Sequence, residues 1–195
     1  YDNLFGFFFF LLFTFCLLPK IANYTFLGTV FVYLLAIRKI YSLQSLRKLT
    51  EKLFDSGFWL GVLFIIDPRT LLFTPLIYFA AYIHHKITVQ TLLVPIVGWV
   101  TPLILYFSYN LWQGSVADFN SLFEPQFRVN FSFYTSSKYL FLIYFLCITA
   151  SISVVAKSYR AFAINNTFRK NWILIVMNTV LTLLYIVFID AKNGS

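Results

Sequence analysis

The stretch from Gly57 to Ile83 constrains the fold most, because it is apolar throughout except for Asp67-Pro68-Arg69 near its middle. It is longer than the about 20 residues that one transmembrane helix needs. Proline removes a helical hydrogen-bond donor and disfavours helical geometry in the residue before it. The stretch is therefore either one long, kinked span or two short helices, 57–66 and 70–83, that form a hairpin with Asp67 and Arg69 at its tip.

The low content of charged residues assigns the chain to the membrane proteins. Of its 195 residues, 60% are hydrophobic and 11% are charged, whereas about 25% of the residues in a soluble domain are charged. We expect an all-α fold in which a single domain forms a polytopic transmembrane helical bundle. In addition to the hairpin, apolar runs predict spans at residues 4–18, 22–37, 91–112, 138–156 and 172–189.

Some residues refine the description of these spans. Pro95 and Pro102 fall inside the run 91–112 and are expected to kink it. Trp172 and Tyr185 are expected to anchor the last span at the membrane interfaces. The first run is short for a span and the chain opens at Tyr1, so we expect that the chain is truncated at its N-terminus.

The segment 40–54 has a different pattern, in which apolar residues recur at spacings of mostly three and four with charged residues between them. This pattern predicts an amphipathic helix that lies in the plane of the cytoplasmic membrane interface. Such a helix is either a linker without a ligand or a docking site for anionic lipid headgroups or a cytoplasmic protein. In the second case, Arg47 and Lys48 are candidate lipid- or phosphate-binding residues.

The distribution of basic residues predicts how the chain threads the membrane, because lysine and arginine mark cytoplasmic loops. The segment 38–55 contains five basic residues and the segment 157–171 contains four, whereas 113–137 contains only Arg128. A single crossing at 57–83 would place the four charges of 157–171 outside. A hairpin with both ends in the cytoplasm fits every loop, and 113–137 is then an extracytoplasmic loop.

Charges at membrane depth are costly, by about 2.5–3.5 kcal/mol each on insertion scales, and are candidates for function. Asp67 and Arg69 have two interpretations. In the structural one, they form an ion pair at the hairpin tip, and Asp67 caps the second arm with Pro68 in its first turn. In the functional one, Arg69 binds a lipid phosphate and Asp67 orients it.

Other chemical signatures are weak. Adjacent His84 and His85 would point to different sides of a helix, and no third ligand lies nearby in the sequence, so we expect no metal site and no cofactor. Asp118 and Glu124 in the outer loop could act as a general base or as metal ligands in a lipid-linked sugar transferase, but such acids are more often solvated. Alternation over 127–133 predicts a short extended segment.

Several motifs support a resemblance to a known family. Ser45-Leu46-Arg47-Lys48-Leu49 is followed by Phe54-Asp55 with Trp59, and then by Leu93-Val94-Pro95-Ile96-Val97-Gly98. Over about residues 34–107, the chain resembles a family of uncharacterised polytopic inner-membrane proteins of Bacteroidota. The resemblance implies location in the inner membrane and assigns no activity. The short hairpin is also similar in architecture to multi-span glycosyltransferases that use polyprenyl-phosphate sugars.

These features lead to one leading expectation for function. We expect a multi-pass integral protein of the bacterial inner membrane that takes part in cell-envelope biogenesis, as a scaffold or as a degenerate relative of the transferases. The alternatives are an active lipid-linked glycosyltransferase or ligase and a small-solute transporter. Expected partners are the bilayer, an anionic or polyprenyl-phosphate lipid, and a membrane or cytoplasmic protein. Cytoplasmic loops account for the net charge of +8, so no nucleic acid is needed as a partner.

Overall fold

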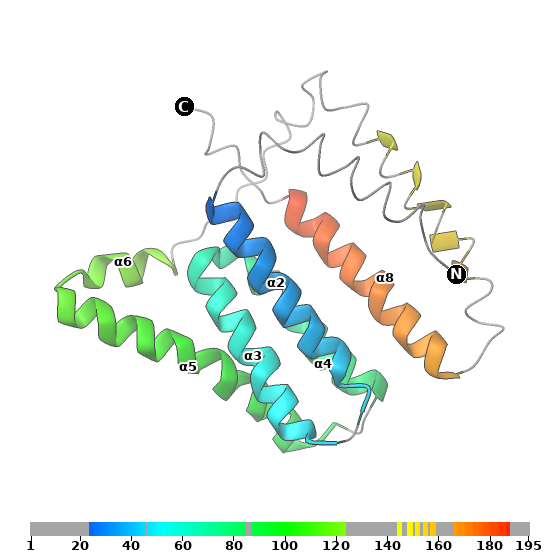
Figure 1. The fold of residues 1–195 in the computed structure, drawn as a ribbon, viewed down its shortest axis with the longest axis horizontal. Helices are drawn as coiled ribbons and strands as arrows, with labels where there is room; N and C mark the ends of the chain where they lie inside the picture. The colour runs from blue at the N-terminus through cyan, green and yellow to red at the C-terminus, as the bar shows by residue number, and fades with distance from the viewer. Residues whose placement is uncertain are drawn as a thin grey trace.

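The fold consists of packed helices (Figure 1). The computed structural model describes residues 24–45, 47–84, 87–123 and 166–187, and, between 144 and 158, residues 144–145, 148–149, 151–152, 154–155 and 157–158. Within these residues the chain forms helices and no strand, which confirms the expected all-α fold. The helices are α2 (Tyr24–Ser42), α3 (Leu49–Ile66), the 3₁₀ helix η1 (Pro68–Phe73), α4 (Thr74–His84), α5 (Val89–Gln113), α6 (Val116–Ser121) and α8 (Asn166–Val187).

Several predictions concern residues outside the described part of the chain. They are the span at 4–18, much of the span at 138–156 and the extended segment at 127–133. Glu124 and His85 also lie outside it.

The stretch 57–83 reverses direction at Asp67-Pro68. The last hydrogen bond of α3 joins the Asp67 amide to the Leu63 carbonyl, and Pro68 then opens η1. Helix α4 returns along α3, so that the start of α3 and the end of α4 lie at the same end of the bundle (Figure 1). The first arm is longer than expected, because α3 begins at Leu49 rather than at Gly57. Its 18 residues span about 27 Å.

The segment 40–54 does not form the single interfacial helix that we expected. Helix α2 continues to Ser42, a turn follows, and α3 begins at Leu49. Lys48 adopts the left-handed conformation, with φ of 57°, and this conformation cannot continue a helix. The Lys52 ammonium donates to the carbonyl oxygens of Ser42 and Ser45, at 2.9 and 3.1 Å, and so satisfies acceptors at the end of α2.

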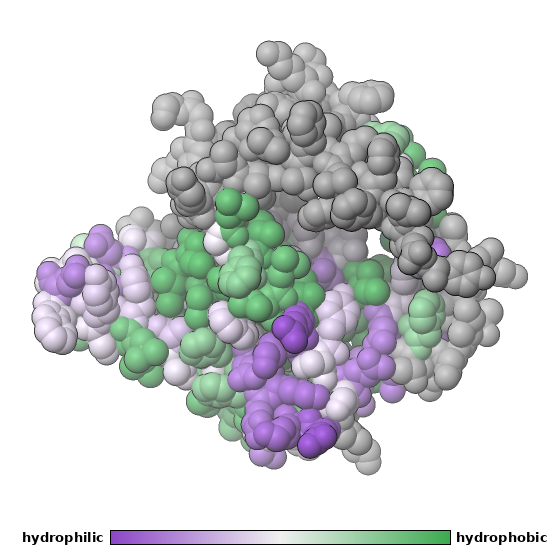
Figure 2. All heavy atoms as spheres, viewed as in Figure 1, coloured by the Kyte–Doolittle hydropathy of each residue, from purple (hydrophilic) through white to green (hydrophobic). Residues whose placement is uncertain are grey.

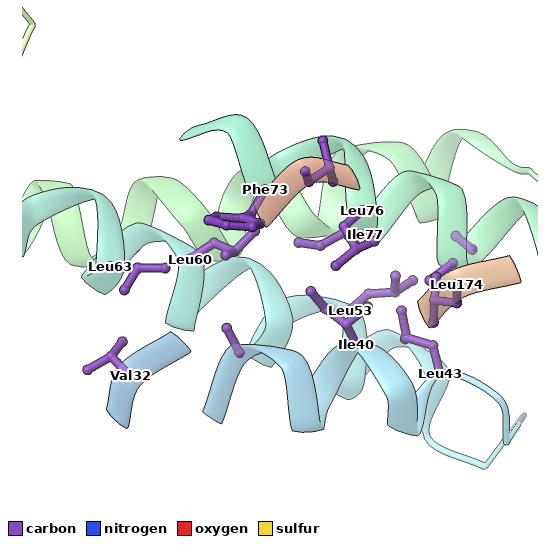
Figure 3. Packing of buried hydrophobic residues seen from close by; sticks show 14 residues of the cluster. Val32, Ile40, Leu43, Leu53, Leu60, Leu63, Phe73, Leu76, Ile77 and Leu174 are labelled. Carbon is purple, nitrogen blue, oxygen red and sulfur yellow. The ribbon is translucent and has the colours of Figure 1, made fainter. Parts of the chain in front are cut away.

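The apolar spacing in 40–54 has a different cause from the one we assigned. Ile40 near the end of α2, Leu43 in the turn that follows and Leu53 in α3 are all buried in one core. Two helix ends that cover the same core therefore produced a periodicity like that of one amphipathic helix. Figure 3 shows this core, which α2, α3, η1, α4 and α8 build from Val32, Ala36, Ile40, Leu43, Leu53, Leu60, Leu63, Phe73, Leu76, Ile77, Ala80, Ala81, Leu174 and Leu181.

Helices α3 and α5 pack closely through three glycines. A Cβ atom at Gly57 would overlap the Pro95 carbonyl, and one at Gly61 would overlap the carbonyl of Trp99. On the other helix, a Cβ atom at Gly98 would overlap the Phe54 carbonyl. The absence of side chains at these positions lets the two backbones touch, as small residues do at the interfaces of membrane helices.

Among the helices of the described residues, only α5 is both long enough and apolar enough to be a candidate membrane span. Thr88 and Thr91 cap its start reciprocally, and Gly114 ends it in the left-handed conformation with φ of 72°. Only 28% of its most apolar 18-residue window is buried within the protein. A core helix of a soluble protein is mostly buried, so this low burial is weakly consistent with a membrane span.

Charge divides the bundle into two ends. Helix α2 ends, and α3 and α8 begin, at what we term the basic end; there the Asn171 amide donates to the Gln44 side chain at 3.3 Å. Hydrophilic residues gather where α2 ends and α3 begins (Figure 2). Arg69 lies at the opposite end, beside Asp67. The other lysines and arginines of the described chain belong to the basic end, and they are Arg38, Lys39, Arg47, Lys48, Lys52, Lys157, Arg169 and Lys170.

Candidate functional site

Asp67 organises the turn between α3 and α4. Its Oδ1 atom accepts hydrogen bonds from the backbone amide of Arg69 at 3.1 Å and from the Arg69 Nε at 3.0 Å. Its backbone carbonyl accepts from the Thr70 amide and hydroxyl, at 3.0 and 2.7 Å. Pro68 occupies the first turn of η1, where its missing amide proton is not needed. The cap and the ion pair of the structural interpretation are therefore both present.

The second oxygen of the same carboxylate binds a distant helix. Tyr185 of α8 donates its hydroxyl to Asp67 Oδ2 at 2.6 Å. The ring of Phe73 lies beside this bond, with its centroid 5.6 Å from that of Tyr185 and 4.8 Å from that of Tyr33. Tyr185, which we expected to anchor α8 at the membrane interface, joins α8 to the Asp67 turn.

A second polar contact joins α8 to α2. The Tyr33 hydroxyl lies 3.0 Å from Asn178 Oδ1, to which it donates, and 3.2 Å from Thr182 Oγ1. Asn178, Thr182 and Tyr185 follow one another at spacings of four and three, which places them on one face of α8. These three polar residues were visible in the sequence of α8, but we did not predict from them that α8 makes polar contacts.

Arg47 and Lys48 lie far from Asp67 and Arg69. They are exposed in the turn before α3, at the basic end, and the full length of α3 separates them from Asp67. Lys48 forms an exposed ion pair with Glu51 at 2.9 Å, of a type that contributes about 0–1 kcal/mol. The four candidate lipid- or phosphate-binding residues therefore form two separate groups.

No group of three or more histidine, cysteine, aspartate or glutamate side chains that could hold a metal ion occurs in the described residues. Asp118 is exposed on α6, at the end of α5 that leads away from the basic end. Phe119 and Phe123 attach this segment to the bundle: the Phe119 ring packs on Phe107 with centroids 4.8 Å apart, and the Phe123 ring lies 5.8 Å from Phe64.

A cavity of about 240 Å³ lies between α3, α4 and α5. Its lining includes Gly57 and Leu60 of α3, Thr74 and Tyr78 of α4, and Trp99 of α5. Two polar atoms of these side chains, Thr74 Oγ1 and Trp99 Nε1, are buried and have no hydrogen-bond partner within the described structure. The Tyr78 hydroxyl donates to the Leu92 carbonyl at 3.3 Å.

The side chain of Asp67 connects the turn to α8 and is largely buried. Both carboxylate oxygens accept hydrogen bonds from the protein, and the Asp67 side chain is only 14% exposed. The ion pair with Arg69 also lowers the cost of holding each charge away from water.

Comparison with known proteins does not assign a family to the chain. No family model matches it, no curated protein is similar to it in sequence, and no solved structure matches it. The resemblance to inner-membrane proteins of Bacteroidota therefore stays a prediction. Function has to be argued from the two groups of charged residues, the cavity and the exposed apolar surface.

Proposed function

We propose that this chain is a multi-pass integral protein of the bacterial inner membrane that acts as a scaffold in cell-envelope biogenesis. The segregation of its basic residues carries this proposal. Eight lysines and arginines belong to one end of the described bundle, and Arg69 alone lies at the other, where Asp67 pairs with it. Basic residues accumulate on the cytoplasmic side of membrane proteins, so the basic end is the cytoplasmic end.

The order of the helices is consistent with this orientation. Helix α2 runs toward the basic end, α3 runs away from it, α4 returns, and α5 and α8 run away again (Figure 1). Both ends of the hairpin are then cytoplasmic, and the Asp67 turn and α6 belong to the extracytoplasmic half. The charge rule and the path of the chain thus lead to the same threading.

The helix contacts and surface also support a membrane location. Backbone contact at Gly57, Gly61 and Gly98 is the type of packing that drives association between helices in lipid, where burial of apolar side chains gives no advantage. Large apolar side chains cover the outer face of α5, and Val97, Ile104 and Leu105 are each more than half exposed. Lipid chains would cover such a face.

The scaffold role rests on Asp67. Protein groups donate to both of its oxygens, so Asp67 connects the hairpin to α8. A transferase would need another acid, for which Asp118 on α6 is the exposed candidate on the proposed outer side. The apolar cavity does not favour a small-solute transporter, since transporters bind their substrates with polar groups near the midplane.

Cysteine labelling in intact cells tests the threading. In a background with Cys16→Ala and Cys147→Ala, single cysteines replace Thr88 before α5 and Ser121 at the end of α6, both of which are exposed. We expect a membrane-impermeant maleimide to label Ser121→Cys from outside and to label Thr88→Cys only after permeabilisation. The opposite result would reverse the orientation, and labelling of both positions would exclude a crossing by α5.

The scaffold role is tested at Asp67 itself. We expect Asp67→Asn to lower thermal stability in detergent, because the amide weakens the contacts to Arg69 and Tyr185. We expect no change in the transfer of sugar from polyprenyl-phosphate donors by membranes that contain the protein. Loss of a transfer activity by Asp67→Asn at unchanged stability would support the transferase instead, with Asp118→Asn as the matched comparison.

A further inference from the structure

We propose that the cavity between α3, α4 and α5 holds an acyl chain of a bilayer phospholipid, which enters from the side of the bundle. This inference rests on the proposed membrane location and adds a binding site to it. The lining of the site includes Leu71 of η1 but none of the charged residues of the Asp67 turn or of the basic end. Its position among three helices would make the bound chain part of the packing between the hairpin and α5.

The wall of the cavity selects a hydrocarbon occupant. Gly57, Leu60 and Ile77 present apolar surface. Three lining side chains carry a polar atom, and two of these atoms, Thr74 Oγ1 and Trp99 Nε1, are buried. The Tyr78 hydroxyl is directed to the Leu92 carbonyl. A sugar, an ion or a phosphate would lose its hydration there without gaining hydrogen bonds, which is unfavourable. A hydrocarbon chain has no such cost.

The rim of the cavity connects it to the lipid-facing surface. Leu71 and Ile96 line the cavity and are 42% and 47% exposed. Ile96 continues into the exposed apolar face of α5 through Leu93 and Val97, which are 54% and 58% exposed. The molecules that would surround this face in a bilayer are lipid chains, so the same chains are the ones that can reach the opening.

The size of the cavity suits a segment of a chain rather than a whole lipid. Its volume of about 240 Å³ exceeds the about 150 Å³ of an engineered apolar cavity that stays dry and binds benzene. Hydrocarbon that fills an apolar cavity gains dispersion contacts with the walls, which otherwise lack partner atoms on one side. The headgroup of the lipid would stay outside, at the membrane surface.

Trp99 supplies a reporter for the test, because bromine atoms on an acyl chain quench tryptophan on contact. One variant keeps Trp99 alone, with Trp59, Trp112 and Trp172 changed to Phe. A matched variant adds Val97→Trp and Trp99→Phe, which puts the reporter at nearly the same depth on the outer face. Both are reconstituted in vesicles of phosphatidylethanolamine and phosphatidylglycerol, with acyl chains that are either unmodified or dibrominated near their middle.

We expect brominated lipid to cause a loss of Trp99 fluorescence comparable with the loss from the Val97→Trp reporter. Thr74→Phe and Ile96→Phe, which fill the cavity from two different helices, should each relieve the quenching of Trp99 and leave that of the Val97→Trp reporter unchanged. Circular dichroism identifies a variant that has lost its helices, and the other filling variant then decides the result.

The outcomes separate the inference from the function on which it rests. Quenching of the Val97→Trp reporter without quenching of Trp99 would overturn the acyl-chain site and leave the membrane location intact. Quenching of Trp99 that neither filling variant relieves would also overturn it. Absence of quenching at both positions would contradict the membrane location itself.

Discussion

Tyr185 connects the Asp67 turn to α8 through a hydrogen bond to a charged acceptor. Hydrogen bonds to charged groups contribute more than those between neutral groups, and interhelical bonds in membranes reach about 1.7 kcal/mol. We predict that Tyr185→Phe lowers the free energy of unfolding by about 1.5 kcal/mol, a value near that upper limit. The ring contact with Phe73 persists in this variant, so the loss reports on the hydroxyl alone.

Two other tyrosines serve as controls in the same detergent-unfolding titration. Tyr33→Phe removes bonds to the neutral Asn178 and Thr182 side chains and should cost about 0.6 kcal/mol, the average for such bonds in membranes. Tyr82 is 67% exposed, and Tyr82→Phe should change stability little. Equal losses for Tyr185→Phe and Tyr33→Phe would show that the Asp67 charge does not strengthen its bond.

Lys48 carries a conformational cost that glycine would remove. The left-handed conformation costs a residue with a side chain roughly 1–2 kcal/mol, and Lys48 has φ of 57°. We predict that Lys48→Gly is more stable than Lys48→Ala by about 1 kcal/mol. Both variants lose the exposed pair with Glu51, so their difference in thermal unfolding isolates the backbone. A Lys48→Ala protein as stable as Lys48→Gly would contradict the turn geometry.

Local chemistry at Asp67 was predictable and its distant partner was not. An aspartate before a proline and two residues before an arginine predicts a cap and an ion pair, because these contacts involve neighbours in the chain. The bond to Tyr185 crosses 118 positions. The sequence contains the polar face of α8, but it does not specify which helix that face meets.

At the scale of elements, the contact between α3 and α5 depends on glycine. We predict that Gly57→Ala and Gly61→Ala each destabilise the protein by about 1–3 kcal/mol, the usual cost of overpacking, because the new methyl group meets a backbone carbonyl of α5 that cannot rotate away. Gly28 in α2 has no atom within 4 Å of the corresponding position. Gly28→Ala should therefore change stability by less than about 1 kcal/mol.

Thermal unfolding of the three purified variants compares these effects directly. Similar stabilities for Gly28→Ala and Gly61→Ala would mean that α3 and α5 do not touch at Gly61. A distance measurement between spin labels on the exposed faces of α3 and α5 would then reveal whether the helices separate. The two readouts together distinguish a relaxed contact from one that never forms.

Elements bounded by local signals were easier to predict than those bounded by packing. Pro68 marks the end of α3 in the sequence, and α5 lies within a few residues of the predicted run 91–112. The division of 40–54 had no such marker. Its left-handed residue is a lysine, and its turn is held by Lys52, whose long side chain reaches back ten residues to the Ser42 carbonyl. Only the packed structure brings these groups together.

At the scale of the whole molecule, the distribution of charge and the exposed apolar surface both follow the long axis of α3 and α5. The basic end, the glycine contact and the Asp67 turn follow one another along α3, and the exposed face of α5 runs beside them. In a bilayer, each part has a role: cytoplasmic charge sets orientation, glycines allow helices to associate in lipid, and the paired charges close the hairpin at its far end.

A location of α5 in a bilayer and a location in water predict different effects for one substitution, Ile104→Lys. Ile104 is 58% exposed and lies close to the middle of α5. In water, Ile104→Lys on an exposed surface would change stability by less than about 0.5 kcal/mol. In a bilayer, a lysine near the helix centre costs about 2.5–3.5 kcal/mol on insertion scales. We therefore predict that, for Ile104→Lys, a smaller fraction of the protein stays in the membranes after carbonate extraction.

Val89→Lys is the matched control, because it makes the same kind of change at the first residue of α5, where Val89 is 72% exposed. At the basic end, the lysine would lie among the headgroups, with its charge toward the cytoplasm. We expect this variant to integrate like the parent protein. If Ile104→Lys and Val89→Lys integrate equally well, α5 does not cross the bilayer at this depth. The orientation that we inferred from the basic residues would then also be wrong, because it requires α5 to cross the bilayer.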